Sequence, residues 1–177
     1  MDIIEVITSD HDAAAGLFGA LEDVALDDRR TSDAMHRVVR LAVALKVHCF
    51  AEEHVLYEAV RTANPQLAEL ALEGPYEHEA LDLMLDKLVL HRPGPELRAL
   101  LHVARHEFEH HARDDEERRM LPAVEAWFTE AERTKLGLDM LAEKRRIRPH
   151  VERLVGPPPR VREGGGLRIN HHLRPRH

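Results

Sequence analysis

The stretch His48-Cys49-Phe50-Ala51-Glu52-Glu53 lies within a long run of apolar residues and predicts how the chain folds. His48 and Glu52 are four residues apart, so on an α-helix their side chains lie on the same face. Apolar residues at steps of three or four continue this face: Leu41, Leu45, Leu56 and Ala59. That spacing is typical of a helix face that is buried in a core. An imidazole and a carboxylate on such a face need a partner, because burying an unpaired charge is costly.

Length and composition narrow the class of protein. The chain has 177 residues, which suggests one domain that is large enough to bury a core. Aromatic residues make up only 4% of the chain, while Ala, Leu, Glu and Arg are abundant. This balance favours a helical bundle over a β-sheet. The formal net charge of −7 gives no electrostatic reason to expect nucleic acid or an anionic membrane as a partner.

Three features predict a cytoplasmic protein. The single cysteine, Cys49, excludes an intramolecular disulfide framework and is typical of a reducing compartment. No apolar run approaches the roughly 18 residues of a membrane span. The N-terminus, Met1-Asp2-Ile3-Ile4-Glu5, has no basic segment of the kind that begins a secretory signal.

Capping residues and helical spacing predict five helices. The first runs from about residue 9 to 24, and the second from 31 or 32 to about 63. Gly74-Pro75 is expected to break the chain, after at most a short extra turn or two, so that a third helix spans about 75–90. A fourth helix begins near residue 97 and ends near 121, or continues with a kink to 128. Thr129-Glu130-Ala131-Glu132 reads as the capping box of a fifth helix over roughly 130–148.

Fourteen histidines are the outlying feature of the composition. Each of the first four expected helices carries one on its apolar face: His11, His48, His78 and His111. Two of these have a carboxylate one turn later, namely Glu52 and Asp115. Any one of these residues alone fits an ordinary core or surface position. Their joint occurrence on four inward faces predicts a shared site, since bundles build carboxylate-bridged metal pairs from such side chains. Mixed nitrogen and oxygen donors suit iron or manganese, and zinc is also possible.

Four motifs carry a resemblance to a known family. They are Asp10-His11-Asp12, His48-x3-Glu52-Glu53-x2-Leu56-Tyr57, Glu77-His78-Glu79, and His110-His111-x3-Asp115-Glu116-Glu117 followed by Leu121-Pro122. In this order they resemble the hemerythrin and hemerythrin-like family, whose domains carry the HHE pattern. The resemblance spans about residues 5–128, and the fifth expected helix resembles a C-terminal extension of some bacterial members.

The resemblance implies a four-helix bundle that holds a non-haem di-iron centre. His11, His48, His78 and His111 would then be terminal ligands, and Glu52 and Asp115 bridging carboxylates. We therefore predict an all-α fold, with an up-down-up-down four-helix bundle and an extra C-terminal helix. The predicted domain covers residues 1–155. Residues 156–177, with their proline and glycine tracts, are expected to form a flexible basic tail.

This chain departs from the classical oxygen carriers of the family in the third helix. Those have two histidines one turn apart, whereas here Gly74 and Asp82 lie one turn before and after His78. Asp82, Glu79 or a water is the expected replacement. Losing one histidine opens the site, which favours redox chemistry over reversible oxygen carriage.

The spacing in the fourth helix leaves alternatives open. The carriers place their carboxylate five residues after the histidine, which would select Glu116 after His111. His110 with Asp114 is a further alternative. The apolar stripe through Leu101, Ala104 and Phe108 favours His111 with Asp115.

The expected function is that of a di-iron protein that binds or reacts with O2, peroxide or nitric oxide. A redox or oxidative-stress role is expected, with catalase-like turnover as one form of it. Alternatives are iron storage or sensing, or a metal-stabilised structural bundle without turnover. The expected partner is a small diatomic or peroxide ligand, and neither nucleic acid nor a membrane. The sequence leaves the oligomeric state open.

Overall fold

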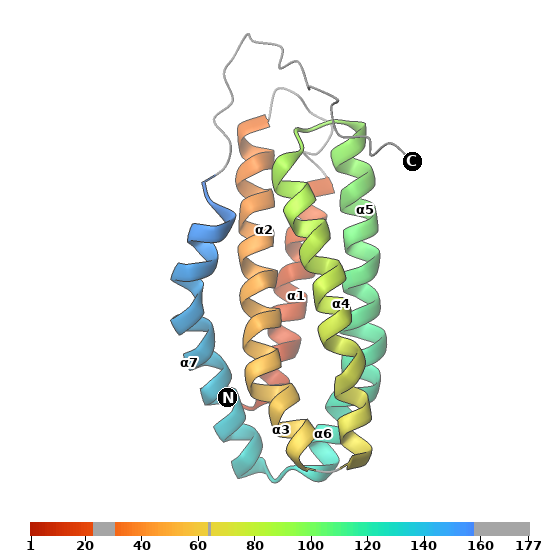
Figure 1. The fold of residues 1–177 in the computed structure, drawn as a ribbon, viewed down its shortest axis with the longest axis vertical. Helices are drawn as coiled ribbons and strands as arrows, with labels where there is room; N and C mark the ends of the chain where they lie inside the picture. The colour runs from red at the N-terminus through yellow and green to blue at the C-terminus, as the bar shows by residue number, and fades with distance from the viewer. Residues whose placement is uncertain (23–30, 64, 158–177) are drawn as a thin grey trace, which may run out of the picture.

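The computed structural model describes residues 1–22, 31–63 and 65–157. These residues form an all-helical, bundle-like fold without a β-strand, which confirms the predicted helical class. Figure 1 shows the long helices running side by side along the longest axis of the molecule. The predicted end of the first helix near residue 24 and nearly all of the predicted tail lie outside the described residues. None of the described helices is long and apolar enough to cross a membrane.

The described residues form a series of helical segments. In chain order these are α1 (Ile3–Glu22), α2 (Thr31–Glu52), η2 (Glu53–Tyr57), α3 (Glu58–Ala63), α4 (Pro65–Leu90), α5 (Pro95–Glu109), η3 (His110–Met120), α6 (Leu121–Trp127) and α7 (Glu130–Val155). The segments η2 and η3 are π-helical, with hydrogen bonds from residue i to i+5 instead of i+4. Each continues directly from an α-helix, so α2–η2–α3 and α5–η3–α6 are two long interrupted helices.

Helix α1 begins six residues before its predicted start at residue 9. Its cap is Asp2, whose Oδ1 accepts the backbone N–H of Ile4 at 3.0 Å. Glu5 completes a reciprocal cap, because its Oε2 accepts the backbone N–H of Asp2 at 3.0 Å. The predicted start near residue 9 was therefore wrong, because an earlier acidic pair, Asp2 and Glu5, caps the helix.

Helix α4 runs without interruption through Gly74-Pro75, so the predicted break there was wrong. Pro75 lacks an N–H and removes one helical hydrogen bond, to the carbonyl of Ala71, but it does not end the helix. Gly74 is buried, and an added Cβ would lie 2.3 Å from the hydroxyl of Tyr57. Close packing of α4 against Tyr57 stabilises the helix where its local sequence, Gly74-Pro75, disfavours a helix.

Helix α7 confirms the predicted capping box. Thr129 Oγ1 accepts the backbone N–H of Glu132 at 3.3 Å, and Glu132 Oε2 accepts the backbone N–H of Thr129 at 2.8 Å. The helix continues through Pro149 to Val155, beyond the predicted end near residue 148. It packs on α1 and α2, and Figure 1 shows it along the outer side of the bundle.

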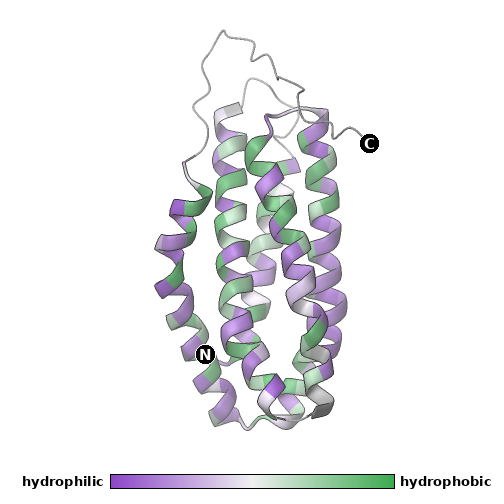
Figure 2. Ribbon diagram, in the orientation of Figure 1, coloured by the Kyte–Doolittle hydropathy of each residue, from purple (hydrophilic) through white to green (hydrophobic). Residues whose placement is uncertain are grey.

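The apolar interior divides into two clusters. One contains Phe18, Leu41, Leu85, Leu101 and Phe108 among others, and the second contains Ile3, Ile7, Val47, Leu56 and Met140 among others. Figure 2 shows hydrophobic and hydrophilic residues alternating along the helices, as expected for amphipathic helices. In α1, His11 lies between Ile7 of the second cluster and Ala14 of the first. A buried polar layer therefore lies between two apolar regions.

Candidate metal centre

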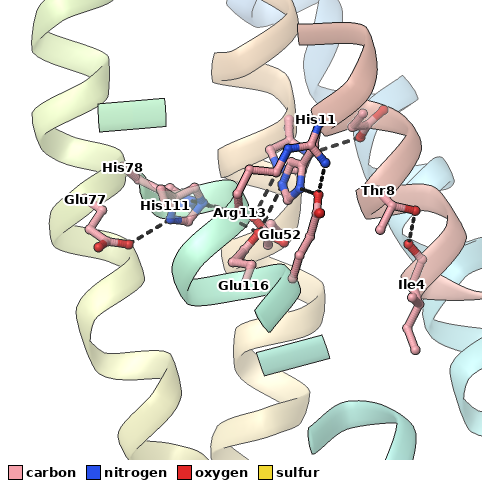
Figure 3. A network of polar contacts seen from close by, with 12 residues as sticks. Ile4, Thr8, His11, Glu52, Glu77, His78, His111, Arg113 and Glu116 are labelled. Carbon is pink, nitrogen blue, oxygen red and sulfur yellow. Dashed lines mark hydrogen bonds and ion pairs between the residues drawn. The ribbon is translucent and has the colours of Figure 1, made fainter. Parts of the chain in front are cut away.

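Six buried polar side chains converge in this layer from four parts of the fold. They are His11 from α1, His48 and Glu52 from α2, His78 from α4, and His111 and Glu116 from η3. Each is at most 4% exposed. Among the described residues, no other histidine or charged side chain is buried. Figure 3 shows five of them, with Glu52 and Glu116 lying between His11 and the pair formed by His78 and His111.

The potential ligand atoms fall into two neighbouring groups. The first comprises His11, His48 and Glu116, and the second comprises Glu52, His78 and His111; within each group the atoms lie within 4.8 Å of one another. The two carboxylates join the groups. Glu52 Oε2 lies 3.2 Å from His48 Nε2 and 3.6 Å from His78 Nε2. Glu116 Oε2 lies 3.1 Å from His11 Nε2 and 3.7 Å from His111 Nε2. This is an arrangement in which two carboxylates can bridge two cations.

The π-helical segment η3 brings Glu116 into the cluster. In a π-helical turn the backbone hydrogen bond spans five residues, so a side chain five positions after His111 can share its face. The segment η2 starts directly after Glu52. Tyr57, five positions after Glu52, can therefore share the face of Glu52 in the same way. The predicted spacing of four, which selected Asp115, assumed a continuous α-helix.

Asp115 lies outside the buried cluster, and this corrects the predicted position of its side chain. Its Oδ2 lies 3.1 Å from His110 Nε2, and its Oδ1 accepts a hydrogen bond from Arg119 at 2.5 Å. His110 is 53% exposed, so the alternative based on His110 with Asp114 also lies at the surface. Glu77, His110 and Asp115 form a separate, partly exposed group. Of the alternatives from the sequence, only His111 with Glu116 has both side chains in the buried cluster.

Each of the four buried histidines is held from outside by a carboxylate. The Nδ1 atoms of His11, His48, His78 and His111 lie 2.9, 3.0, 2.9 and 2.8 Å from oxygens of Glu117, Asp10, Glu53 and Glu77, respectively. A carboxylate can only accept, so Nδ1 carries the hydrogen and the lone pair of a neutral ring lies on Nε2. This is how proteins orient histidine ligands toward a metal. Sequence reasoning missed this set, although each acid belongs to one of the four motifs in the chain.

Further ion pairs fix these outer carboxylates. Lys144 of α7 donates to both oxygens of Asp10 at 2.5 Å. Burial raises the pKa of Asp10, but hydrogen bonds from His48 and Lys144 outweigh it and hold the pKa below its usual value. Arg113 donates to Glu117 at 2.5 Å and to Asp12 at 2.7 Å, and Figure 3 shows its side chain beside His11. Helix α7 is therefore linked to the cluster through Asp10.

The inner atoms of the cluster fit a cation. His11 Nε2, His48 Nε2, both oxygens of Glu52 and Glu116 Oε2 are buried without a hydrogen-bond partner. With the hydrogens on Nδ1, these atoms are all acceptors, and lone pairs face one another. A buried acceptor without a donor is costly. A metal ion satisfies several such atoms at once, and nitrogen with carboxylate oxygen is a donor set that iron, manganese and zinc accept.

The neighbouring carboxylates favour the protonated form of two of these histidines, His48 and His111. Burial lowers the pKa of His48, but the Glu52 and Asp10 carboxylates outweigh it and raise the pKa to about 10. Burial likewise lowers the pKa of His111, and Glu116 with Glu77 raises it overall. Metal binding at this cluster must therefore release protons.

Asp82 and Glu79, the two side chains expected to replace a second histidine in the third helix, lie outside the cluster. Asp82 is 51% exposed and pairs with Lys46, and Glu79 is exposed. Tyr57 lies there instead. It is fully buried, its hydroxyl donates to Glu116 Oε1 at 2.6 Å, and its ring stacks on His78 with 5.5 Å between centroids. The sequence placed Tyr57 next to the second motif but did not indicate this contact.

A helical bundle that encloses paired histidine and glutamate groups belongs to the class of proteins whose interior can bind cations. The model of the hemerythrin HHE cation binding domain matches residues 2–124, and the chain belongs to this family. The match confirms the resemblance seen in the motifs. It runs from the start of α1 into α6, so α7 lies beyond it. Neither the curated proteins nor the solved structures gave a significant match.

Proposed function

We propose that this chain is a non-haem di-iron protein that binds or reacts with O2, peroxide or nitric oxide. The observation that carries the proposal is the pair of buried groups, each with two histidines and one carboxylate, joined by the contacts of Glu52 with His48 and of Glu116 with His111. We also infer an up-down-up-down bundle built from α1, α2, α4 and α5, with α7 added. The packing of α1 on α2 and of α4 on α5 supports that arrangement.

The charge of the site supports the proposal that it binds a small electron-rich ligand. Two carboxylates offset only part of the charge of two divalent cations that lie close together, so an additional anionic or polarisable ligand would be stabilised there. Two histidines for each cation and two shared carboxylates leave coordination positions open at an iron ion. Two iron ions, when bound, can exchange two electrons with an oxygen species.

The burial of the cluster supports selection by size. All six side chains are at most 4% exposed, so a large substrate cannot contact them without rearrangement of the helices. A diatomic molecule or peroxide is small enough for such a site. We infer that neither nucleic acid nor a membrane is a partner, and the net charge of −7 supports this inference. A cytoplasmic location is likewise our inference, supported by the single buried Cys49.

Iron storage or sensing, or a metal-stabilised structural bundle, is the alternative function. The cluster lies between the two apolar clusters, so metal binding would couple the helices and raise the stability of the whole bundle. Such a protein would bind iron without turning over a substrate. The two functions therefore differ in how the iron-loaded protein responds to an added oxidant.

The deciding experiment is metal analysis with an absorption spectrum after iron-replete expression. We expect about two irons per chain, as in carboxylate-bridged bundle centres, and charge-transfer absorption in the near ultraviolet. Glu52→Gln should lose this iron. Cys49→Ala should retain it, because Cys49, about one turn before Glu52, belongs to an apolar cluster. A colourless, iron-free wild-type protein would contradict the proposal. Oxygen evolution after adding peroxide would indicate catalase-like turnover, and a stable spectral change would indicate binding without turnover.

A further inference from the structure

Tyr57 is a buried phenol that contacts two members of the cluster. Its hydroxyl donates to Glu116 Oε1 at 2.6 Å, and its ring stacks on His78 at an interplanar angle of 11°. The side chain comes from η2, directly after the segment that carries His48 and Glu52.

Gly74 makes room for this phenol. A Cβ at position 74 would lie 2.3 Å from the hydroxyl oxygen of Tyr57 and 2.5 Å from its Cζ, distances that atoms in contact do not adopt. Gly74 lies one turn before His78 in α4. The space into which a second inward side chain of α4 would project is therefore occupied by Tyr57. This contact gives a physical reason why α4 contributes a single histidine to the cluster.

The hydrogen bond from Tyr57 makes the two oxygens of the Glu116 carboxylate different. Oε1 is satisfied by the phenol, while Oε2 faces His11 and His111 and has no hydrogen-bond partner. Oε2 is therefore the oxygen of Glu116 that faces the histidines and lacks a partner, which favours it as the donor to a cation. Beside the carboxylate lies a cavity of about 10 Å³, lined by Tyr57, Gly74, Glu116 and Met120 among others. That volume is about one water molecule in size.

We propose that Tyr57 is a positioning residue that restrains Glu116 to one donor oxygen and thereby keeps a place open for a small exogenous ligand. The inference rests on the proposed metal pair. Without the phenol hydroxyl, Oε1 becomes a buried acceptor that lacks a donor. It is then free to act as a second donor atom toward the cation and to compete with the exogenous ligand.

The test compares Tyr57→Phe with Tyr76→Phe, because the chain has only two tyrosines and Tyr76 is 75% exposed. Both variants are prepared with iron, and iron content, melting temperature and azide affinity are measured, the last from the charge-transfer absorption. Tyr57→Phe should retain its iron and bind azide about tenfold more weakly, the scale of one hydrogen bond to a charged group. Tyr76→Phe should behave as the wild type. A purely structural role would lower the melting temperature without changing azide affinity.

Gly74→Ala supplies a second variant that keeps the tyrosine but displaces it. It should weaken azide binding in the same direction, because its Cβ overlaps the hydroxyl position. Unchanged azide affinity in iron-loaded Tyr57→Phe would overturn this inference and leave the proposed function intact. Loss of iron from a folded Tyr57→Phe variant would also overturn it, since the phenol would then be needed to hold the cation. Failure of the wild type to take up iron would instead overturn the proposed function, and this inference with it.

Discussion

Glu116 Oε2 lies 3.7 Å from His111 Nε2, although five residues separate the two side chains. The equivalent pair in α2, His48 and Glu52, is separated by four residues and by 3.2 Å. One carboxylate therefore reaches the cluster through α-helical spacing and the other through a π-helical segment. Insertions of this kind are frequent at functional sites, where they re-aim side chains.

This relationship predicts different effects for two neighbouring substitutions. Glu116→Gln should abolish or strongly weaken iron binding, because an amide cannot supply the negative charge that two cations need. Asp115→Asn should retain the iron, because Asp115 contacts His110 and Arg119 outside the buried cluster. Iron content and absorption spectra of both purified variants check this. Equal loss of iron in the two variants would show that the assignment of Glu116 is incorrect.

The hydrogen bond between Asp10 and His48 predicts a role for an outer carboxylate. Asp10→Asn should lower metal affinity roughly 10- to 100-fold, the usual effect of removing a partner that orients a histidine ligand. Lys144→Ala should have a smaller effect in the same direction, since Lys144 contacts Asp10, which in turn contacts His48. Competition with a chelator measures both affinities. Asp139→Asn is the control, because Asp139 pairs with Lys135 at the surface of α7.

Gly137 predicts a packing constraint between α7 and the N-terminus. A Cβ there would lie 2.3 Å from the carbonyl oxygen of Met1, so Gly137→Ala should destabilise the protein by about 1–3 kcal/mol. Gly16 is the matched control, since a Cβ at this helical position meets nothing within 4 Å. Gly16→Ala should stabilise by about 0.5–1 kcal/mol. Urea unfolding of both variants measures the difference, and equal effects would contradict the close approach.

The cap of α7 predicts a modest loss of stability. Thr129→Ala should cost about 1 kcal/mol, because Thr129 accepts the N–H of Glu132 at the first turn. Thermal unfolding at neutral pH measures it. Thr134→Ala is a suitable control within the same helix. A similar loss of stability there would show that the loss in Thr129→Ala does not come from the cap.

The same cap predicts a pH dependence. Hydrogen bonds from the side chain and backbone of Thr129 lower the pKa of Glu132 below its ordinary value of 4.5. A lowered pKa favours the folded state when the group is ionised, so this contribution is present above pH 4.5 and is lost as the pH falls through the folded value. The stability difference between the wild type and Glu132→Gln should therefore be constant above pH 4.5 and shrink below it. A difference that stays constant down to pH 3 would contradict the prediction.

Much of the site could be predicted from residue spacing. His11, His48, His78, His111 and Glu52 were assigned to inward helix faces, and all five are buried together. Their role as ligands stays a prediction. The α-helical period was sufficient for these residues because each lies on a regular helix face or at the start of a π-helical segment.

Three features could not be predicted from local spacing. The choice of Glu116 over Asp115 depends on a π-helical segment, and the continuity of α4 through Pro75 depends on packing of neighbouring helices. The contact between Tyr57 and Gly74 joins residues from different helices. None of these is a property of a single window of sequence.

The sequence by itself determined a helical protein with one histidine on the inward face of each of four helices. The reason is that the period of 3.6 residues sorts side chains into faces, and burial selects the apolar face. Only the tertiary structure decided which carboxylates reach these histidines and which outer acids orient them. Those choices depend on hydrogen bonds and packing between helices, whose free energy outweighs the small local difference between an α-helical and a π-helical turn.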